Sequence, residues 1–497
     1  MHWRLELLRD ALDFRAGGYD GATETRKRPS AMWRGVSAVD EDSQIGKWDR
    51  SRLRLECLDL RRNNPIVAGV CERFADNVVG AGIVPQAKTS SATWNEQAES
   101  FFREWGKVCD YRKRNSLREI QRMVVQQRLL AGESFFALTD GRQIQPIEAE
   151  RIVTPAGKEA ESRIVDGIRL SDGGIPLEFF VAPRDKQGRA DATKTEPVRR
   201  EDIIHVAASM RFDQVRGIPE LSPVITALRD FGMLTESTLD RAKMDARRGW
   251  AISGEQGAQK MRNLGDRNVT ANAVAGGKIY EKIEDGTTYY LGKDEKIESL
   301  ASNTPNSQYV SFNELILRII GASLSIPYEF LILDFKQGSF SASKAAMAQT
   351  YKTFLNWWTW TCERFCHRLW VWRIAAAIKD RDLPPAPVDG RGVSEWWKVE
   401  WSQPDYTWID PEGGVDAATK SFNLGVGSIS SFARKQGRDG EDVLREKAGD
   451  IATAARLAQE LNAAMPGHDF TWRDLISSLP PGTLTTQPQQ PATEMKP

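Results

Sequence analysis

Apolar residues recur at helical spacing over much of this chain, so helices dominate the expected structure. In the first third, helices are expected over 52–79, which NNP at 63–65 divides in two, over 94–105 and over 116–130. The Ser116-x-x-Glu119 spacing is that of a capping box at the start of the last of these. The pattern therefore predicts a helical layer close to the N-terminus.

Between about Glu133 and His205 the pattern changes to short apolar runs separated by turn formers. The runs are SFFAL, IQPIEAERIV, ESRIVDGIRL, LEFFVA and DIIHVA. Since they are short and joined by turns such as DG and DGG, we expect a mostly antiparallel β layer that packs on the first helices.

Longer helices are expected in the second half of the chain. Ser222 and Pro223 form an N-cap and N1 pair for a helix that runs to about Arg248. Ser311 and Glu314 form a second capping box for a helix that ends before Pro327. The longest helix is expected over 342–379, after the SFS run at 339–341.

The segments around these helices differ in character. Residues 250–300 are short-stranded and rich in turns, which favours a small α/β insertion. A separate helical region is expected to about Pro466, and the Pro, Gln and Thr-rich tail that follows is expected to be disordered. Residues 1–50 show no sustained periodicity and indicate an extended arm.

Composition restricts the function. The chain has 497 residues, enough for two to four domains, and 68 Lys and Arg residues balance 68 Asp and Glu residues. A zero net charge argues against a protein that grips nucleic acid over its whole surface, because such proteins need excess positive charge. Five cysteines without a CxxC pair indicate a reducing compartment. No signal peptide or membrane span is evident, so we expect a soluble protein made in the cytoplasm.

Sequence motifs for phosphate or dinucleotide binding are incomplete. AGGKI at 275–279 lacks the hydroxyl residue that a P-loop needs after its lysine. GVGSIS at 425–430 lacks the third glycine of a dinucleotide-binding fingerprint and a preceding strand. We expect a turn at the first position and a helix-to-helix loop at the second.

Motifs for nucleophilic or metal chemistry fail in a similar way. Ser341-x-x-Lys344 has no SDN or KTG partner and is better explained as a helix start. Cys362, Cys366 and His367 fall on an apolar helical face, which favours packing over zinc binding. The sequence therefore predicts no enzyme activity, no catalytic residue, no metal site and no cofactor.

Two further features allow two interpretations each. Residues 103–128 hold eight Lys or Arg against three acidic residues, and could meet nucleic acid or form a solvated or subunit-contacting face. The second is favoured because aromatic residues do not alternate with the charges. Five tryptophans within 357–372 could belong to the core or could partly contact another subunit.

Seven segments carry, in the same order, a resemblance to a known family. They are RNNPIVAGVCERFADNVVGAGIVP at 62–85, VVQQRLLAGESFFAL at 124–138, RFDQVRGIPELSPVITAL at 211–228, SLSIPYEFLILDF at 323–335, FSASKAAM at 340–347, WSQPDYTWIDPEGGVDAA at 401–418 and ISSFARKQGRDGEDVLREKA at 429–448. In these segments the chain resembles phage portal proteins of the lambda type.

The resemblance implies an α+β portal fold that is mainly helical, with wing, stem, clip and crown regions, a β layer in the wing and a small α/β clip. Carried over by position, the regions are an N-terminal arm (1–50), a wing (51–220 and 342–408), two stem helices (221–249 and 304–326), a clip (250–303), a tunnel loop (327–341), a crown (409–466) and a disordered tail (467–497).

The function implied by the resemblance is structural. Portal proteins form a ring, usually of twelve subunits, at one vertex of the capsid, and the ring is the channel for genome packaging and ejection. Expected partners are double-stranded DNA, the large terminase subunit, capsid and scaffold proteins and later the head–tail connector proteins, with no membrane. The expected location is the virion, after assembly in the cytoplasm of the bacterial host.

The tunnel loop is the segment expected to face DNA. Its residues are Asp334, Phe335, Lys336, Gln337, Ser339 and Phe340. Where lambda-type relatives tend to carry Tyr-Ser-Ser-Ala-Arg, this chain has Phe-Ser-Ala-Ser-Lys at 340–344, so the backbone role carries over and the side-chain contacts do not.

The mixed polarity of this loop favours transient contact with DNA, because many phosphate contacts around a ring would resist sliding. We expect Lys336 and its neighbours to touch the DNA backbone weakly, and a partner to supply ATP hydrolysis. The alternatives are an enzyme of the packaging machine, either a terminase or a maturation protease, and a general nucleic-acid-binding module.

Overall fold

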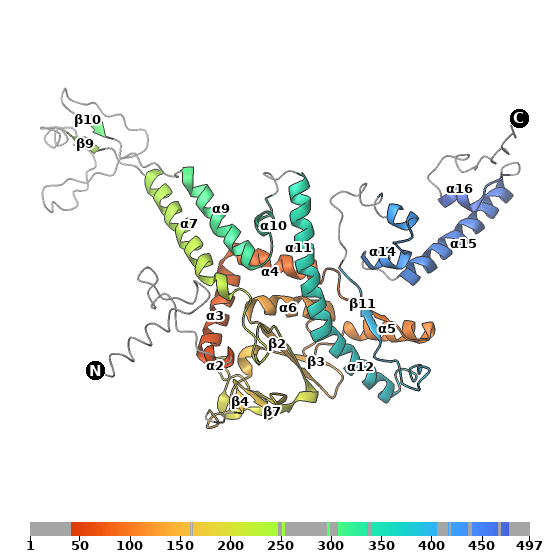
Figure 1. Cartoon of the computed structure of the whole chain (residues 1–497), viewed down its shortest axis with the longest axis horizontal. Helices are drawn as coiled ribbons and strands as arrows, with labels where there is room; N and C mark the ends of the chain where they lie inside the picture. Colours follow the sequence, from red (N-terminus) through yellow and green to blue (C-terminus); the bar gives the residue numbers. More distant parts are fainter. Residues whose placement is uncertain are drawn as a thin grey trace, which may run out of the picture.

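The computed structural model describes most of the chain. The described residues are 41–159, 161, 163–246, 251–253, 296–298, 307–334, 340–404, 416, 419–435, 440–465 and 469–476. They form a body of helices and small sheets, from which a pair of helices projects on one side and the C-terminal helices on the other (Figure 1).

The predicted helical layer is present near the N-terminus. Its helices are α2 (Glu41–Gln44), α3 (Lys47–Asn63), α4 (Pro65–Val78), α5 (Ala92–Gly106) and α6 (Leu117–Leu130). Asn64 separates α3 from α4, because its side-chain oxygen accepts hydrogen bonds from two amides in the first turn of α4 at 3.0 and 3.2 Å. Ser116 and Glu119 form the predicted capping box of α6. Helices α2 and α3 begin inside the region 1–50, where no helix was expected.

The two larger sheets of the described residues, one of three strands and one of four, are both antiparallel. One has the order β3-β2-β8 and the other the order β4-β5-β6-β7. Their bounds are β2 (Glu133–Leu138), β3 (Ile144–Ile147), β4 (Ile164–Val165), β5 (Ile168–Leu170), β6 (Pro176–Val181), β7 (Glu196–Arg199) and β8 (Ile203–Ala207). The antiparallel prediction is confirmed, but β7 was not expected, because its sequence EPVR shows no apolar alternation. A 3₁₀ turn, η3 (Ala149–Arg151), ends the apolar run that begins with β3.

A third pairing joins distant parts of the chain. Strand β1 (Pro85–Ala87), which follows α4, pairs antiparallel with β11 (Val399–Trp401), and Pro85 lies opposite Trp401. The pairing holds the segment around β11 against α5.

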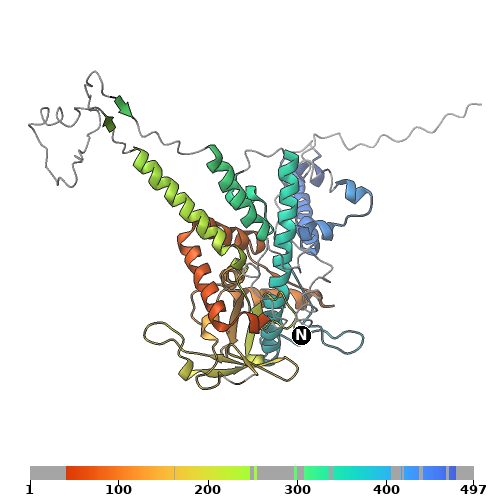
Figure 2. The same cartoon turned by 60° about the vertical axis from the view of Figure 1, so that its left-hand side comes forward.

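The projecting pair consists of α7 (Ile225–Ala246) and α9 (Ser307–Ser323), which lie side by side in both views (Figures 1 and 2). Both predicted starts are wrong. Ser222 is the first residue of a 3₁₀ turn, η6 (Ser222–Val224), and makes no cap hydrogen bond. Helix α9 begins at Ser307, so Ser311 lies inside it. The first turn of α9 lies close to α7, because the side chains of Thr235 and Thr238 are near enough to the Tyr309 hydroxyl to lower its pKa.

The predicted long helix is present as three consecutive elements. They are α11 (Phe340–Thr361), a π-helical turn η7 (Cys362–Cys366) and α12 (His367–Asp380). The amide of His367 donates to the carbonyl of Cys362, five residues back, which is the hydrogen bond of a π-turn. Trp357 and Trp370 are buried in the core, and the other three tryptophans of this stretch are partly buried against it. The core interpretation of these tryptophans is therefore supported.

The C-terminal part is helical, with α14 (Ile429–Lys435), α15 (Gly440–Ala464) and α16 (Trp472–Ile476). Helix α16 lies in the segment 467–497, where disorder was expected. It is tied to α15 by the Asn462 side chain, which accepts a hydrogen bond from the Phe470 amide at 2.7 Å. In the segment 250–303, strands β9 (Ala251–Ser253) and β10 (Lys296–Glu298) pair antiparallel.

One large core joins the first helices, β2, β8, α9, α10 (Tyr328–Ile332), α11 and α12. A smaller core, which includes Phe135, Ile168 and Phe179, lies between the two sheets. The α+β fold class predicted from the sequence is thus confirmed. None of the helices in the described residues is both long and apolar enough to cross a bilayer.

Candidate functional site

In the sequence, the segment expected to face DNA connects α10 to α11. These two helices lie beside the projecting helix pair (Figure 1). Asp334 follows α10 directly, and its amide donates to the carbonyl of Glu329 at 3.1 Å. Phe340 is the first residue of α11. Phe335, Lys336, Gln337 and Ser339 lie outside the described residues, so the structure places only the two ends of the segment.

Helix α10 fixes the first of these ends. Phe330 and Leu331 are buried, and the ring of Phe330 packs 5.4 Å from that of Phe354 on α11. The Arg73 guanidinium on α4 donates to the Leu331 carbonyl at 2.6 Å. Because α10 is held from two sides, the chain arrives at Asp334 in a defined place. The sequence did not predict this short helix, since its stability comes from α4 and α11.

The turn between α9 and α10 is equally constrained. A Cβ atom on Gly321 would lie 2.7 Å from the Ile326 carbonyl oxygen, so the close approach requires glycine. The hydroxyl of Thr353 on α11 donates to the carbonyl of Ser325 at 2.9 Å. Together these contacts fix the C-terminal end of α9 against α11.

The loop that leads into the N-terminal end of α7 is held by a buried charge cluster around Glu133, the first residue of β2. The Arg216 guanidinium lies 2.6 Å from the Glu133 carboxylate, and neither side chain is exposed. Arg54 on α3 donates to the same carboxylate. Arg216 also donates to the carbonyls of Ile152 and Ala149 at 3.2 and 3.1 Å. The loop that leads into α7 is thereby tied to α3 and to both sheets.

Further acidic groups complete the cluster. Asp166, in the turn between β4 and β5, lies 3.3 Å from Arg216 and 3.2 Å from Arg50. Asp42 on α2 lies 3.0 Å from Arg50 and accepts a hydrogen bond from the Val215 amide at 2.7 Å. The cluster therefore pairs its buried arginines with carboxylates, as burial of charge requires.

Two glycines allow the close approach on which this cluster depends. A Cβ atom on Gly217 would lie 2.3 Å from the carbonyl oxygen of Gly132, and one on Gly132 would meet the Ile218 backbone at the same distance. Gly132 also has a φ of +78°, which L side chains rarely adopt. The two backbones can meet only because both positions are glycine.

The cluster sets the charge states of its members. Burial raises the pKa of Glu133, but the charges of Arg216 and Arg54 and the hydrogen bond from His205 hold it well below its ordinary value. Burial lowers the pKa of His205, and the interaction with Glu133 only partly opposes this. At neutral pH the cluster holds an ionised carboxylate beside a neutral imidazole, 3.0 Å apart.

Sequence reasoning missed this cluster. The residues come from four helices and strands, one turn and one loop. The signal that could have found them is the pairing of AGE at 131–133 with RGIP at 216–219. Each motif combines a glycine with a charged residue beside apolar neighbours, which is unusual for a solvent-exposed turn. Both motifs lie within the segments that carry the family resemblance.

The basic segment 103–128 does not form one continuous cationic face. Ion pairs join Lys107 to Glu104, Arg122 to Glu72 and Asp76, and Arg128 to Glu220. Residues 112–114 remain exposed on a loop that the buried Asp110 carboxylate organises by accepting hydrogen bonds from backbone amides. The arrangement supports a solvated or subunit-contacting face over a nucleic-acid grip.

The projecting pair has a conspicuous apolar surface. Phe312, Leu315 and Ile319 follow each other at helical spacing on α9 and are each more than half exposed, at 53%, 51% and 55%. Met233 and Leu239 on α7 are similarly exposed. Charged side chains nearby are paired, such as Arg318 with Glu314 at 3.1 Å. A helix with apolar residues on both its inner and outer faces is unusual for a solvent-exposed position.

Comparison with known proteins identifies the family. The family model for phage portal proteins of the lambda family matches residues 26–357, well over half of the chain. A probable portal protein of Halomonas phage phiHAP-1 is 23% identical over 472 residues, covering 88% of this chain and 86% of the relative. The portal protein of Escherichia phage N15 is 20% identical over 466 residues, covering 84% and 86%.

A solved structure is also similar. It is the neck of an empty gene transfer agent particle, with a TM-score of 0.49 at 14% identity, covering 77% of this chain and 94% of that one. On the family match, the chain belongs to the lambda family of phage portal proteins. Its role is structural, that of a portal, and nothing in these comparisons favours an enzyme of the packaging machine.

Proposed function

We propose that copies of this chain form a closed ring, expected to contain twelve, with the projecting helices α7 and α9 packed side by side around a central channel. The observation that carries this proposal is the apolar stripe of Phe312, Leu315 and Ile319. Burying a large apolar side chain stabilises by roughly 1.5–3 kcal/mol, so a second copy that covers the stripe would gain several such contributions. In this proposal α7 and α9 are the stem, and the hairpin of β9 and β10 belongs to the clip.

DNA would pass through the channel past the segment between α10 and α11. The anchoring of α10 by Arg73 and Phe354 supports this, since a loop that contacts moving DNA needs fixed ends. The paired charges on the stem support sliding rather than gripping, because few unpaired cations are left on the described helices to bind phosphates. We expect Lys336 to make only weak backbone contacts.

The remaining partners follow from the family. We infer that the ring sits at one vertex of the capsid in the virion, after assembly in the bacterial cytoplasm, where the large terminase docks and supplies ATP hydrolysis. Capsid, scaffold and head–tail connector proteins would bind other surfaces of the ring. ATP hydrolysis by the purified chain alone would overturn this division of labour.

Ring formation can be tested with two matched substitutions. Leu315→Asp places a carboxylate in the stem stripe, whereas Val393→Asp places one at an equally exposed apolar residue, 54% exposed, in the hairpin that precedes β11. Light scattering and negative-stain electron microscopy of the purified proteins should find rings for the parent chain and for Val393→Asp. Leu315→Asp should give monomers or small open assemblies, and closed Leu315→Asp rings would contradict the proposed interface.

A further inference from the structure

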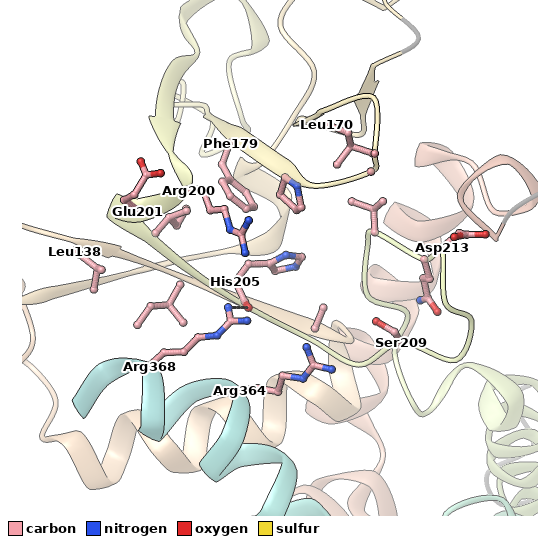
Figure 3. Close-up of a pocket in the computed structure, with 18 of the residues that line it drawn as sticks. Leu138, Leu170, Phe179, Arg200, Glu201, His205, Ser209, Asp213, Arg364 and Arg368 are labelled. Atoms are coloured by element: carbon pink, nitrogen blue, oxygen red, sulfur yellow. Dashed lines mark hydrogen bonds between the residues drawn. The ribbon is translucent and has the colours of Figure 1, made fainter. Parts of the chain in front are cut away.

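A cleft of about 820 Å³ lies in the body, between the sheets and the helix that carries the π-turn (Figure 3). Its volume is within the range of sites that bind ligands or peptide side chains. The proposed channel, ring contacts and buried charge cluster make no use of this cleft, although His205 on β8 belongs to both its lining and the cluster.

Three guanidinium groups face this cleft. Arg364 comes from η7, Arg368 from α12 and Arg200 from η5 (Arg200–Asp202), and Figure 3 shows them pointing toward one another across the cleft. Among the described residues, no carboxylate forms an ion pair with any of the three. Glu201 and Asp213 lie at the margins of the cleft in Figure 3. The cleft thus has three guanidinium groups and two carboxylates in its lining, and none of the three guanidinium groups is held in an ion pair among the described residues.

The three arginines are close enough for their charges to affect one another. Burial, followed by the charges of Arg364 and Arg200, lowers the pKa of Arg368. Arg368 is also fixed in direction, because it donates a hydrogen bond to the His205 carbonyl at 3.3 Å. Arginines that repel one another in a partly enclosed site would be stabilised by a bound anion.

Arg364 and Arg368 share one face of the helix because residues four apart lie on the same side of it. Both arginines line the cleft, one on each side of the end of η7, while Phe365 and Leu369, which directly follow them in sequence, are buried in the core. π-turns of this kind occur often at functional sites.

Most of the other lining residues are apolar, although Glu201, His205, Ser209, Asp213 and Gln214 also line the cleft. Leu138, Phe179, Val371 and Trp372 contribute to the walls. At the edge, Phe212 is fully exposed and Met210 beside it is 73% exposed, although both are large apolar residues. The cleft therefore combines cationic and apolar recognition in one place.

We propose that this cleft binds a segment of a partner protein that carries carboxylates next to apolar side chains. Guanidinium groups bind carboxylates through paired, charge-assisted hydrogen bonds, and Phe212 with the apolar wall would contact the side chains between them. Duplex DNA fits less well, because its phosphates lie on a rigid cylinder that offers no apolar group to Phe212 and cannot enter a recess between a sheet and a helix. An extended acidic peptide meets both requirements.

The test uses the full-length protein and a short fluorescent peptide of alternating glutamate and leucine. Fluorescence anisotropy should show saturable binding, and the same peptide with glutamine in place of glutamate should bind roughly tenfold to a hundredfold more weakly. Arg364→Glu/Arg368→Glu should lose binding to a similar extent. The milder Arg364→Gln should weaken it partly, and circular dichroism should show that both variants remain folded.

The matched control is Arg391→Glu/Arg456→Glu, which makes the same change in net charge at two exposed arginines outside the cleft. This control should bind the peptide as the parent does. Equal binding of the glutamine peptide, or unchanged binding by both cleft variants, would overturn the proposal. A short DNA duplex that competes fully with the peptide for the cleft would assign it to nucleic acid instead.

Discussion

Glu133 and Arg216 form a fully buried ion pair, 83 residues apart in sequence, with 2.6 Å between the carboxylate and the guanidinium. Glu133 starts β2, whereas Arg216 belongs to the loop that enters η6 and α7. The pair therefore connects the β layer to the root of the projecting helices.

Replacing Glu133 with Gln should destabilise the fold strongly. The change keeps the side-chain volume but leaves Arg216 and Arg54 buried without their counter-charge, which typically costs about 3–5 kcal/mol. Urea unfolding followed by circular dichroism measures this free energy. The control is Asp172→Asn, at an exposed ion pair with Arg163, which should cost less than about 1 kcal/mol. Equal losses for the two variants would show that burial does not control the strength of the Glu133 pair.

The stability of the fold should also fall in mild acid. The pKa of His205 is lower in the folded chain than its ordinary value of about 6.5, so below that pH the unfolded chain takes up a proton that the folded chain does not. The free energy of unfolding should therefore decrease as the pH drops from about 6.5 toward the lowered folded pKa.

His205→Gln removes this titration and keeps a donor near Glu133, so its stability should change less than that of the parent between about pH 7 and pH 5.5. His367 provides a comparison, because burial also lowers its pKa but its side chain is partly exposed. Urea unfolding at both pH values measures the difference. A decline in His205→Gln as steep as in the parent would assign the acid sensitivity to other groups.

Gly217→Ala should be disruptive although alanine is small. Its Cβ would lie 2.3 Å from the Gly132 carbonyl oxygen, which real Cβ atoms essentially never approach, so the backbone must shift. Overpacking of this kind typically costs about 1–3 kcal/mol. Gly449→Ala is the control, because nothing lies within 4 Å of a Cβ at that position of α15 and alanine favours helix there. Thermal unfolding should show a lower midpoint for the first variant and an unchanged or higher one for the second.

Replacing Asp334–Ser339 with a glycine linker tests the proposed tunnel loop. Because α10 is anchored by Arg73 and Phe354, the fold and the rings should survive the change, whereas DNA packaging should be impaired. Electron microscopy of the purified variant and a packaging assay measure the two outcomes separately. Loss of rings would assign the segment a structural role in assembly.

The sequence by itself determined the elements that are stabilised locally. The division of α3 from α4 at Asn64 and the start of α6 at Ser116 follow from caps whose partners lie within three residues. The strands β2 and β8 follow from the short apolar runs that contain them. The seven ordered segments were sufficient for the family, and the expected fold class and structural role agree with the comparisons.

Tertiary structure alone decided the elements whose partners are distant in sequence. The start of α9 lies against α7, where Tyr309 is close to Thr235 and Thr238, and α10 is held by Arg73, which binds the Leu331 carbonyl from 258 residues away. A balance of 68 positive and 68 negative residues likewise leaves open which charges meet. Which oppositely charged groups Glu133 and Arg216 meet, and which arginines of the described residues stay outside ion pairs in the cleft, depend on how the chain folds back on itself. Periodicity and caps report only interactions between near neighbours along the chain.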